Sequence, residues 1–286
     1  MSMLAATGPE RVLPLELIRV AARIRDSRAL VLSGAGMSTA SGIPDYRGPD
    51  GRRRVTPMQY GEFVATSAAR QRYWARSFVG WQRFTEAAPN DGHRAVTRLQ
   101  AAGHLGPVIT QNVDGLHQAA GTREVTELHG ALADVVCLTC GDRSSRWGLD
   151  ERMRQANPDF VVESTEIRPD GDVSLEQIDV ERFITPTCLV CGRDTLKPDV
   201  VFFGESVPRP RVDRCFALTE RAEALIVLGS SLAVMSGLRF VRRAAARGIP
   251  VVIVTRLLAR GDDLATERLD GDLPATLGDL VNVLDA

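Results

Sequence analysis

Residues 29–47 read ALVLSGAGMSTASGIPDYR and decide the fold expected for this chain of 286 residues. The apolar run at 29–32 predicts a buried parallel strand. The run breaks at Gly34-Ala35-Gly36, where small residues let the backbone approach a ligand closely. Ser38 and Thr39 follow as hydroxyl donors at a possible helix start, where backbone amides bind phosphate. The stretch predicts a nucleotide site, although many Gly-x-Gly turns bind nothing.

The end of the same stretch strengthens this prediction. Pro44 stiffens the loop because its ring fixes the backbone. Asp45 and Arg47 then place opposite charges on either side of Tyr46, where an ordinary turn needs none. We therefore expect this loop to contact a ligand.

The composition excludes several classes of protein. Hydrophobic residues make up 44% of the chain, and the net charge is -1 with both signs spread throughout, so no basic face favours nucleic acid. Apolar runs fall short of membrane-spanning length. The first residues, MSMLAATGPER, lack the basic and then apolar pattern of a signal peptide. We expect a cytoplasmic protein that binds neither nucleic acid nor a membrane, with its oligomeric state open.

Apolar runs and helical patterns alternate along most of the chain. Helices are expected at 15–24, 91–102, 212–221, 238–247 and 273–284, and strands at 29–33, 107–110, 125–128, 200–203, 224–228 and 251–254. Alternating strands and helices predict an α/β fold with a doubly wound, parallel, Rossmann-like sheet. We expect residues 1–132 and 200–286 to form this domain.

Two stretches depart from the alternation. Residues 57–88 are rich in aromatic side chains at helical spacing, which usually belong to a core, and they predict a small helical insertion at 48–90. Residues 133–199 contain four cysteines and a charged stretch, 151–177, with little hydrophobic periodicity. We expect a separate module over 133–199, with 151–177 as a long loop.

Small or polar residues follow several of the predicted strands. They read GAG at 34–36, QNVD at 111–114, HG at 129–130 and GSS at 229–231. In a doubly wound sheet, ligands bind in the crevice beyond the carboxyl ends of the strands. We therefore place the chemistry in this crevice.

The cysteines form two C-x-x-C knuckles, Cys137 with Cys140 and Cys188 with Cys191, each followed by glycine. Four thiolates in this arrangement suit tetrahedral zinc. The alternatives are a disulfide pair or a redox C-x-x-C motif, but a cytoplasmic location disfavours structural disulfides and one redox motif needs only one knuckle. We expect a closed, structural zinc site, and Cys215 as a core residue of a helix.

In this order, the motifs resemble the signature of the sirtuins, the NAD-dependent protein deacylases. The resemblance runs from Leu30 to about Leu284, and GIPDYRG-x-DG and YWARSFVGW look like the class that includes the mitochondrial-type sirtuins. It implies NAD as a co-substrate, structural zinc, and acylated lysine in protein substrates as the partner. The implied reaction transfers the acyl group to ADP-ribose and releases nicotinamide and O-acyl-ADP-ribose.

The resemblance also implies roles for single residues. His129, which taken alone is more often structural than catalytic, becomes the general base that takes a proton from a ribose hydroxyl of NAD. Asn112 and Asp114 resemble the catalytic pair that orients nicotinamide and its ribose, and Gln111 borders that ribose. The other implied cofactor contacts are Gly34, Ala35, Gly36, Ser38, Thr39, Asp45, Tyr46, Arg47, Gly229, Ser230, Ser231, Thr255 and Arg256.

Residues 197–205, KPDVVFFGE, resemble the substrate-binding segment of the family. By that resemblance, Val201 and Phe203 line the acyl-lysine tunnel. The backbone at Gly204 and Glu205 pairs with the substrate peptide as an added strand. Without the family, the same residues describe only a buried strand with an exposed end.

The resemblance fails after the strand at 251–254. There the family places Asn, a variable residue and Gly to hold the adenosine ribose, whereas this chain has Thr255-Arg256-Leu257. Thr255 keeps one hydrogen-bonding group but lacks the second of an amide, and Leu257 replaces a permissive glycine. We expect weaker binding of the adenine end of NAD.

Three functions are compatible with these residues. The first is a zinc-containing, NAD-dependent protein-lysine deacylase. The second is a protein mono-ADP-ribosyltransferase that uses the same cleft, with a protein side chain attacking in place of the acyl oxygen. The third is a non-catalytic NAD-sensing module. The reaction products distinguish them: O-acyl-ADP-ribose, ADP-ribosylated protein, or no released nicotinamide.

Overall fold

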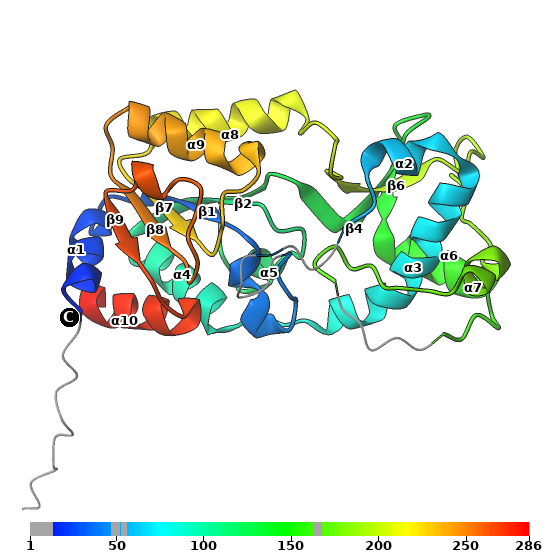
Figure 1. Ribbon diagram of the computed structural model, residues 1–286, viewed down its shortest axis with the longest axis horizontal. Helices are drawn as coiled ribbons and strands as arrows, with labels where there is room; N and C mark the ends of the chain where they lie inside the picture. Colours follow the sequence, from blue (N-terminus) through cyan, green and yellow to red (C-terminus); the bar gives the residue numbers. More distant parts are fainter. Residues whose placement is uncertain (1–13, 47–51, 53–55, 163–167, 286) are drawn as a thin grey trace, which may run out of the picture.

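A computed structural model describes residues 14–46, 52, 56–162 and 168–285. Its main sheet has the strand order β3 (Val125–Glu127), β2 (Leu105–Thr110), β1 (Ala29–Ser33), β7 (Leu225–Leu228), β8 (Val251–Val254) and β9 (Glu267–Leu269). Every neighbouring pair is parallel. Counted along the chain, these strands follow the order 3-2-1-4-5-6 of doubly wound dinucleotide-binding folds. The predicted fold class is confirmed (Figure 1).

Helices cover both faces of this sheet (Figure 1). One face packs against α1 (Leu15–Ile24), α4 (Asp91–Ala101) and α10 (Leu273–Asp285), and the other against α8 (Arg209–Arg221) and α9 (Met235–Ala246). β1 serves both layers, because Val31 joins the first cluster whereas Leu30 and Leu32 join the second. A strand covered on both faces needs this continuous apolar run. Cys215 of α8 is fully buried in the second cluster, as predicted.

A smaller, antiparallel sheet contains β5 (Arg143–Ser145), β4 (Gly130–Cys137) and β6 (Leu196–Val200), in that order. The helices associated with it are α2 (Tyr60–Ala65), α3 (Ser67–Glu86), α6 (Arg146–Ala156) and α7 (Gln177–Arg182). One hydrophobic cluster joins Trp74 and Phe78 of α3 with Val135 of β4 and Leu149 of α6. The aromatic stretch is therefore core, as predicted, and it shares that core with the part of the chain that holds the cysteines.

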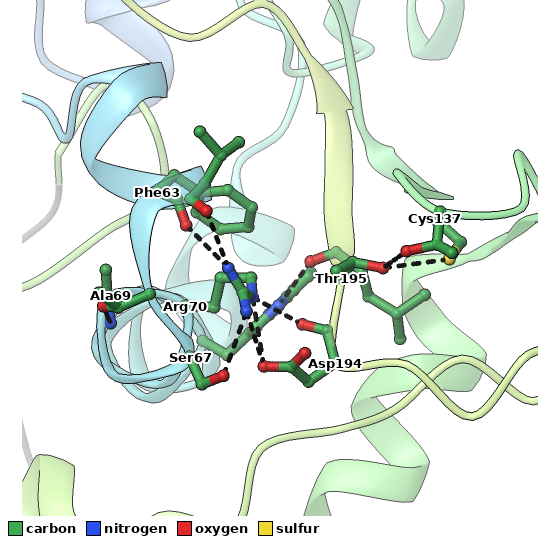
Figure 2. A network of polar contacts seen from close by, with 12 residues as sticks. Phe63, Ser67, Ala69, Arg70, Cys137, Asp194 and Thr195 are labelled. Atoms are coloured by element: carbon green, nitrogen blue, oxygen red, sulfur yellow. Dashed lines mark hydrogen bonds and ion pairs between the residues drawn. The ribbon is translucent and has the colours of Figure 1, made fainter.

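Arg70 of α3 fastens the helical part to the cysteine-containing part (Figure 2). Its Nη2 lies 2.9 Å from Oδ2 of Asp194, and its Nε donates to the backbone carbonyl of Asp194 at 2.9 Å. The hydroxyl of the next residue, Thr195, lies 3.5 Å from Sγ of Cys137. The guanidinium side chain is only 9% exposed. The two parts are therefore joined by a charged contact between a buried guanidinium and a partly exposed carboxylate, as well as by their shared core.

The prediction of a loop over 151–177 is wrong at its beginning, because α6 continues to residue 156. The buried positions of α6 are Arg146, Leu149, Asp150 and Met153, at helical spacing. Arg146 and Asp150 form an ion pair with 3.2 Å between Nη1 and Oδ1, and both side chains are almost fully buried. Charged residues therefore occupy two of the four buried positions of α6. For this reason the apolar residues of this helix do not show a helical period on their own.

Other boundaries differ as well. β6 ends at Val200, so the strand expected at 200–203 lies mostly before that range. The sequence patterns also missed β4, β5 and β9, the last two having three residues each. The borders predicted at 133 and 199 fall inside β4 and β6. The division into a Rossmann-like domain and an inserted module stays a prediction.

The remaining helical elements in the described part of the chain are short. They are α5 (Leu116–Ala119) and three 3-10 turns, η1 (Ala35–Met37), η2 (Thr39–Ser41) and η3 (Asp262–Leu264). Among residues 14–46, 56–162 and 168–285, no helix has the length and apolar composition required to cross a membrane.

Candidate active site

Residues that follow the parallel strands surround one cavity of about 1080 Å³. A cavity of this size is large enough to enclose a small-molecule ligand. The predicted site residues that line it are Gly34, Ala35, Gly36, Ser38, Thr39, Asp45, Tyr46, Gln111, Asn112, Asp114, His129, Val201, Phe203, Gly204, Glu205, Gly229, Ser230, Ser231, Thr255 and Arg256. The predicted Arg47 lies outside the described residues.

The turns after β1 and β7 touch each other at the edge of this cavity. The N–H of Gly34 donates to the carbonyl of Leu228, and the N–H of Gly36 donates to the carbonyl of Gly229, both at 2.9 Å. A Cβ on Gly36 would lie 2.8 Å from the carbonyl oxygen of Gly229, so any larger residue would force the turns apart. The strand order reverses between β1 and β7, which is where dinucleotides bind in this architecture.

Ser38 joins the glycine turn to the residues that follow β2. Its hydroxyl donates to Oδ2 of Asp114 at 2.6 Å and accepts from Nδ2 of Asn112 at 3.0 Å. Nδ2 of Asn112 also donates to the carbonyl of Gly34, at 3.1 Å. These bonds fix the orientation of both side chains before any ligand arrives, which lowers the entropic cost of binding one.

His129 follows β3 and is held through both ring nitrogens. Nδ1 lies 2.8 Å from the backbone carbonyl of Gln111, and Nε2 lies 2.9 Å from the hydroxyl of Ser236. A carbonyl only accepts, so Nδ1 carries the proton and Nε2 presents its lone pair when the ring is neutral. Burial lowers the pKa of His129 below 6.5, and the charges of Arg211 and Arg239 act in the same direction, whereas the Gln111 carbonyl opposes them. The ring is therefore neutral at pH 7, as a base must be.

The segment after β6 is attached directly to His129. The N–H of Val201 donates to the carbonyl of His129 at 2.8 Å. The carbonyl of Phe203 accepts from the N–H of Tyr60 at 2.9 Å, and the ring of Phe203 meets that of Tyr46 edge to face at 5.5 Å. The N–H of Glu205 is already bonded to the carbonyl of Phe202, so only part of the backbone edge predicted to receive a peptide is free to do so.

Lys197, a residue of β6, stabilises the segment that follows this strand. Its side chain is buried, and Nζ donates to the carbonyls of Pro198 and Val200 and lies 3.1 Å from Oε2 of Glu205. That carboxylate also accepts from the N–H of Phe202 at 2.8 Å. The carboxylate and three carbonyl or amide groups therefore hold the turn that carries Val201 and Phe203.

The far end of the cavity contains the residues that depart from the family pattern. Thr255 follows β8 and is nearly buried, and its N–H donates to the carbonyl of Leu269 in β9. Arg256 forms an ion pair with Asp272, which precedes α10, and both residues line the cavity. The Arg256 guanidinium is thus held at the far end of the cavity by the Asp272 carboxylate.

The polar cavity residues that sequence reasoning missed include Ser236 and Asp272. Asp272 follows β9 and obeys the same strand-end rule as the other site residues, so recognising β9 would have revealed it. Ser236 lies in the first turn of α9, and no sequence pattern indicates its contact with His129. Tyr73, predicted only as core, is buried and also lines the cavity.

The four knuckle cysteines form a compact cluster. Their Sγ atoms all lie within 4.8 Å of one another, with 3.6 Å between Cys137 and Cys191 and 3.7 Å between Cys140 and Cys188. Tetrahedral zinc with Zn–S bonds of about 2.3 Å places its sulfurs about 3.8 Å apart. The glycine after each knuckle has a positive φ and donates its N–H back to the first cysteine. The donor set and its spacing fit a structural zinc ion with all four positions filled.

Comparisons with known proteins agree with these features. The model of the Sir2 family matches residues 34–236. The chain belongs to the Sir2 family. It is 55% identical over 255 residues to NAD-dependent protein deacetylase 1 of Streptomyces coelicolor, a match that covers 89% of this chain and 85% of that protein. It is 44% identical over 262 residues to the mitochondrial NAD-dependent protein lipoamidase sirtuin-4 of Bos taurus, covering 90% and 82% respectively.

Solved structures of Sir2 proteins share the fold of this sirtuin. A complex of Sir2 with a p53 peptide and NAD+ has a TM-score of 0.73 and 29% sequence identity, covering 92% of this chain and 96% of that one. A structure described as a basis for the mechanism and regulation of Sir2 enzymes has a TM-score of 0.72, covering 94% and 98%. The predicted family and fold class are confirmed, and the predicted class of enzyme and its cofactors agree with these relatives.

Removal of one knuckle cysteine should cost this sirtuin its zinc and its stability together. Binding free energy at a structural zinc site is folding free energy, so Cys140→Ala or Cys188→Ala should lose metal and unfold at lower temperature. Elemental analysis and thermal unfolding measure the two effects. Cys215→Ala is the matched control, because it removes a buried thiol from the cluster between the parallel sheet and helices α8 and α9. This variant should keep its zinc. Native protein without zinc would contradict the assignment.

Restoring the family pattern at the far end should tighten NAD binding. In Thr255→Asn combined with Leu257→Gly, the recovered amide adds one hydrogen bond, worth about 0.5–1.5 kcal/mol or roughly 2- to 10-fold in affinity. The change should appear in the KM for NAD more than in kcat, because this end binds ground and transition states alike. An unchanged or higher KM would show that this chain holds adenosine differently.

Proposed function

We propose that this chain is an NAD-dependent protein-lysine deacylase in which His129 is the general base. The observation that carries the proposal is the arrangement of His129 itself. Its Nδ1–H is held by the Gln111 carbonyl, its Nε2 lone pair faces the Ser236 hydroxyl in the cavity, and its own carbonyl accepts from the N–H of Val201. One residue thus joins the strand ends of the nucleotide fold to the segment that resembles the family's substrate-binding residues.

The cavity supports the binding of NAD along its whole length. Because Gly34 and Gly36 lack a Cβ, the turn at Gly229–Ser231 packs directly against them, and both turns line the cavity at the point where dinucleotides bind in this architecture. Asn112 and Asp114, already oriented by Ser38, are assigned to nicotinamide and its ribose. When bound, NAD supplies the electrophilic ribose carbon to which the acyl oxygen of the modified lysine is transferred, with nicotinamide as the leaving group.

His129 acts on the proton of a ribose hydroxyl. With Nδ1 protonated and bonded to a carbonyl, the neutral ring offers only Nε2 as a base, so the direction of proton transfer is fixed by the fold. The lowered pKa keeps this nitrogen free of a proton at pH 7. Asp114 contributes a negative charge to a site where positive charge develops as nicotinamide leaves. With one water consumed to release the lysine, the proposed products are deacylated lysine, nicotinamide and O-acyl-ADP-ribose.

The acyl-lysine would enter between His129 and the segment after β6. Val201 and Phe203 line the cavity there, and the Lys197–Glu205 ion pair holds their backbone. Acetyl-lysine in proteins is the proposed substrate, in line with the deacetylase names of several relatives, including those of Bordetella bronchiseptica and Mycobacterium avium. We also propose a cytoplasmic location for the chain. Detection of ADP-ribosylated peptide would favour the mono-ADP-ribosyltransferase instead. Absence of released nicotinamide would favour the non-catalytic NAD-sensing module.

His129→Ala should abolish deacylation of an acetyl-lysine peptide while leaving the fold and NAD binding largely intact. Loss of a general base costs at least about 10²-fold in rate. Wild-type kcat/KM should fall on acidification only below pH 6.5, because the pKa of His129 is lowered from that value and protonation removes the base. Nicotinamide release and circular dichroism measure activity and folding.

His104→Ala is the matched control, because His104 is a buried histidine beside Asp26 that does not line the cavity. Its activity per folded molecule should stay close to wild type. The assignment of His129 is wrong if His129→Ala keeps more than about a tenth of wild-type activity, since a general base contributes more than that.

A further inference from the structure

Ser236 makes a contact that the proposed deacylation does not use. Its Oγ lies 2.9 Å from Nε2 of His129, inside the same cavity. Because Nδ1 of the ring carries the proton, the Ser236 hydroxyl must donate to the Nε2 lone pair of the neutral ring. A hydroxyl bonded to a histidine base, with that base oriented by a further acceptor on its other nitrogen, is the arrangement that activates serine nucleophiles.

The fold brings Ser236 to this place through a specific approach of α9. Gly237, the next residue, faces the side chain of Gln111, and a Cβ on Gly237 would lie 2.6 Å from Oε1 of Gln111. That side chain is held in turn by Ser230 Oγ at 2.8 Å and the Ser33 carbonyl at 3.2 Å. The absence of a side chain at Gly237 therefore lets the first turn of α9 rest on the residues after β2. Ser236 is presented to His129 as a result.

We propose that Ser236 is an internal acceptor of ADP-ribose when NAD is bound without an acylated lysine. The inference rests on the proposed function, in which a ribose hydroxyl of NAD approaches Nε2 of His129. The Ser236 hydroxyl contacts that same nitrogen, so nucleophile and ribose meet at one base. The carbon that loses nicotinamide is the neighbour of a hydroxyl-bearing carbon in the same ring. In the absence of the acyl oxygen, Ser236 offers a nucleophile that is already bonded to this base.

The step is a substitution at the ribose carbon. The Oγ–C bond forms as the C–N bond to nicotinamide breaks, and nicotinamide leaves with the electron pair of that bond as a neutral molecule. The proton of the Ser236 hydroxyl passes to Nε2 of His129. The product is an ADP-ribosyl group joined to Ser236 Oγ by an O-glycosidic bond, together with one nicotinamide, with no change in oxidation state. Bound acyl-lysine competes for the same carbon, so substrate should suppress the modification.

The inference is tested by incubating the full-length enzyme with NAD alone and mapping the modified residue by mass spectrometry after proteolysis. One ADP-ribosyl group should appear on Ser236, with nicotinamide released in proportion to enzyme. An excess of acetyl-lysine peptide should prevent the adduct. Ser236→Ala should abolish the adduct, and His129→Ala should do the same because it removes the acceptor of the proton.

Ser206→Ala is the matched control, since Ser206 lines the same cavity whereas the ring nitrogens of His129 bond to Gln111 and Ser236. It should keep the adduct on Ser236. ADP-ribose has no nicotinamide to lose, so an adduct that forms equally with ADP-ribose in place of NAD would overturn the proposed substitution. Deacylation without any adduct on Ser236 would overturn this inference alone. Absence of both deacylation and adduct would overturn the proposed function as well.

Discussion

The hydrogen bond from Nδ1 of His129 to the carbonyl of Gln111 is the contact on which the site depends. It is possible because β2 and β3 are adjacent and parallel, with Thr110 paired to Glu127, so the chain segments that leave both strands emerge side by side. The N–H of Leu128 extends that ladder to the carbonyl of Thr110 at 2.8 Å, and the His129 ring completes it. One backbone carbonyl thereby decides which ring nitrogen can act as a base.

His129 also connects the parallel sheet to the smaller, antiparallel sheet. β4 begins immediately after His129, at Gly130, and the carbonyl of His129 receives the N–H of Val201 as the chain leaves β6. The antiparallel sheet that continues from here carries Cys137 and lies close to the zinc cluster. Zinc bound to the four cysteines would take no part in the chemistry, but it would join the end of β4, at Cys137, to the chain that enters β6.

Strand-end residues can be predicted from sequence because parallel strands align their carboxyl ends, so the sequence places Gly34 and His129 in one crevice. The zinc site was predictable because two matched C-x-x-C knuckles supply four thiolates, more than one redox motif needs. Ser236 was not, since its contact depends on how closely α9 packs against Gln111, a matter of tertiary packing. Asp272 was missed because β9 has only three residues, too few to show a period.

The central claim is that the geometry around His129 directs an acyl group from lysine to the ribose of NAD. The most direct measurement is to identify and count the products formed from one acetyl-lysine peptide and NAD by mass spectrometry. The account predicts equal amounts of nicotinamide, deacetylated peptide and O-acetyl-ADP-ribose. Free acetate in place of O-acetyl-ADP-ribose, ADP-ribosylated peptide, or deacetylation that proceeds without NAD would contradict it.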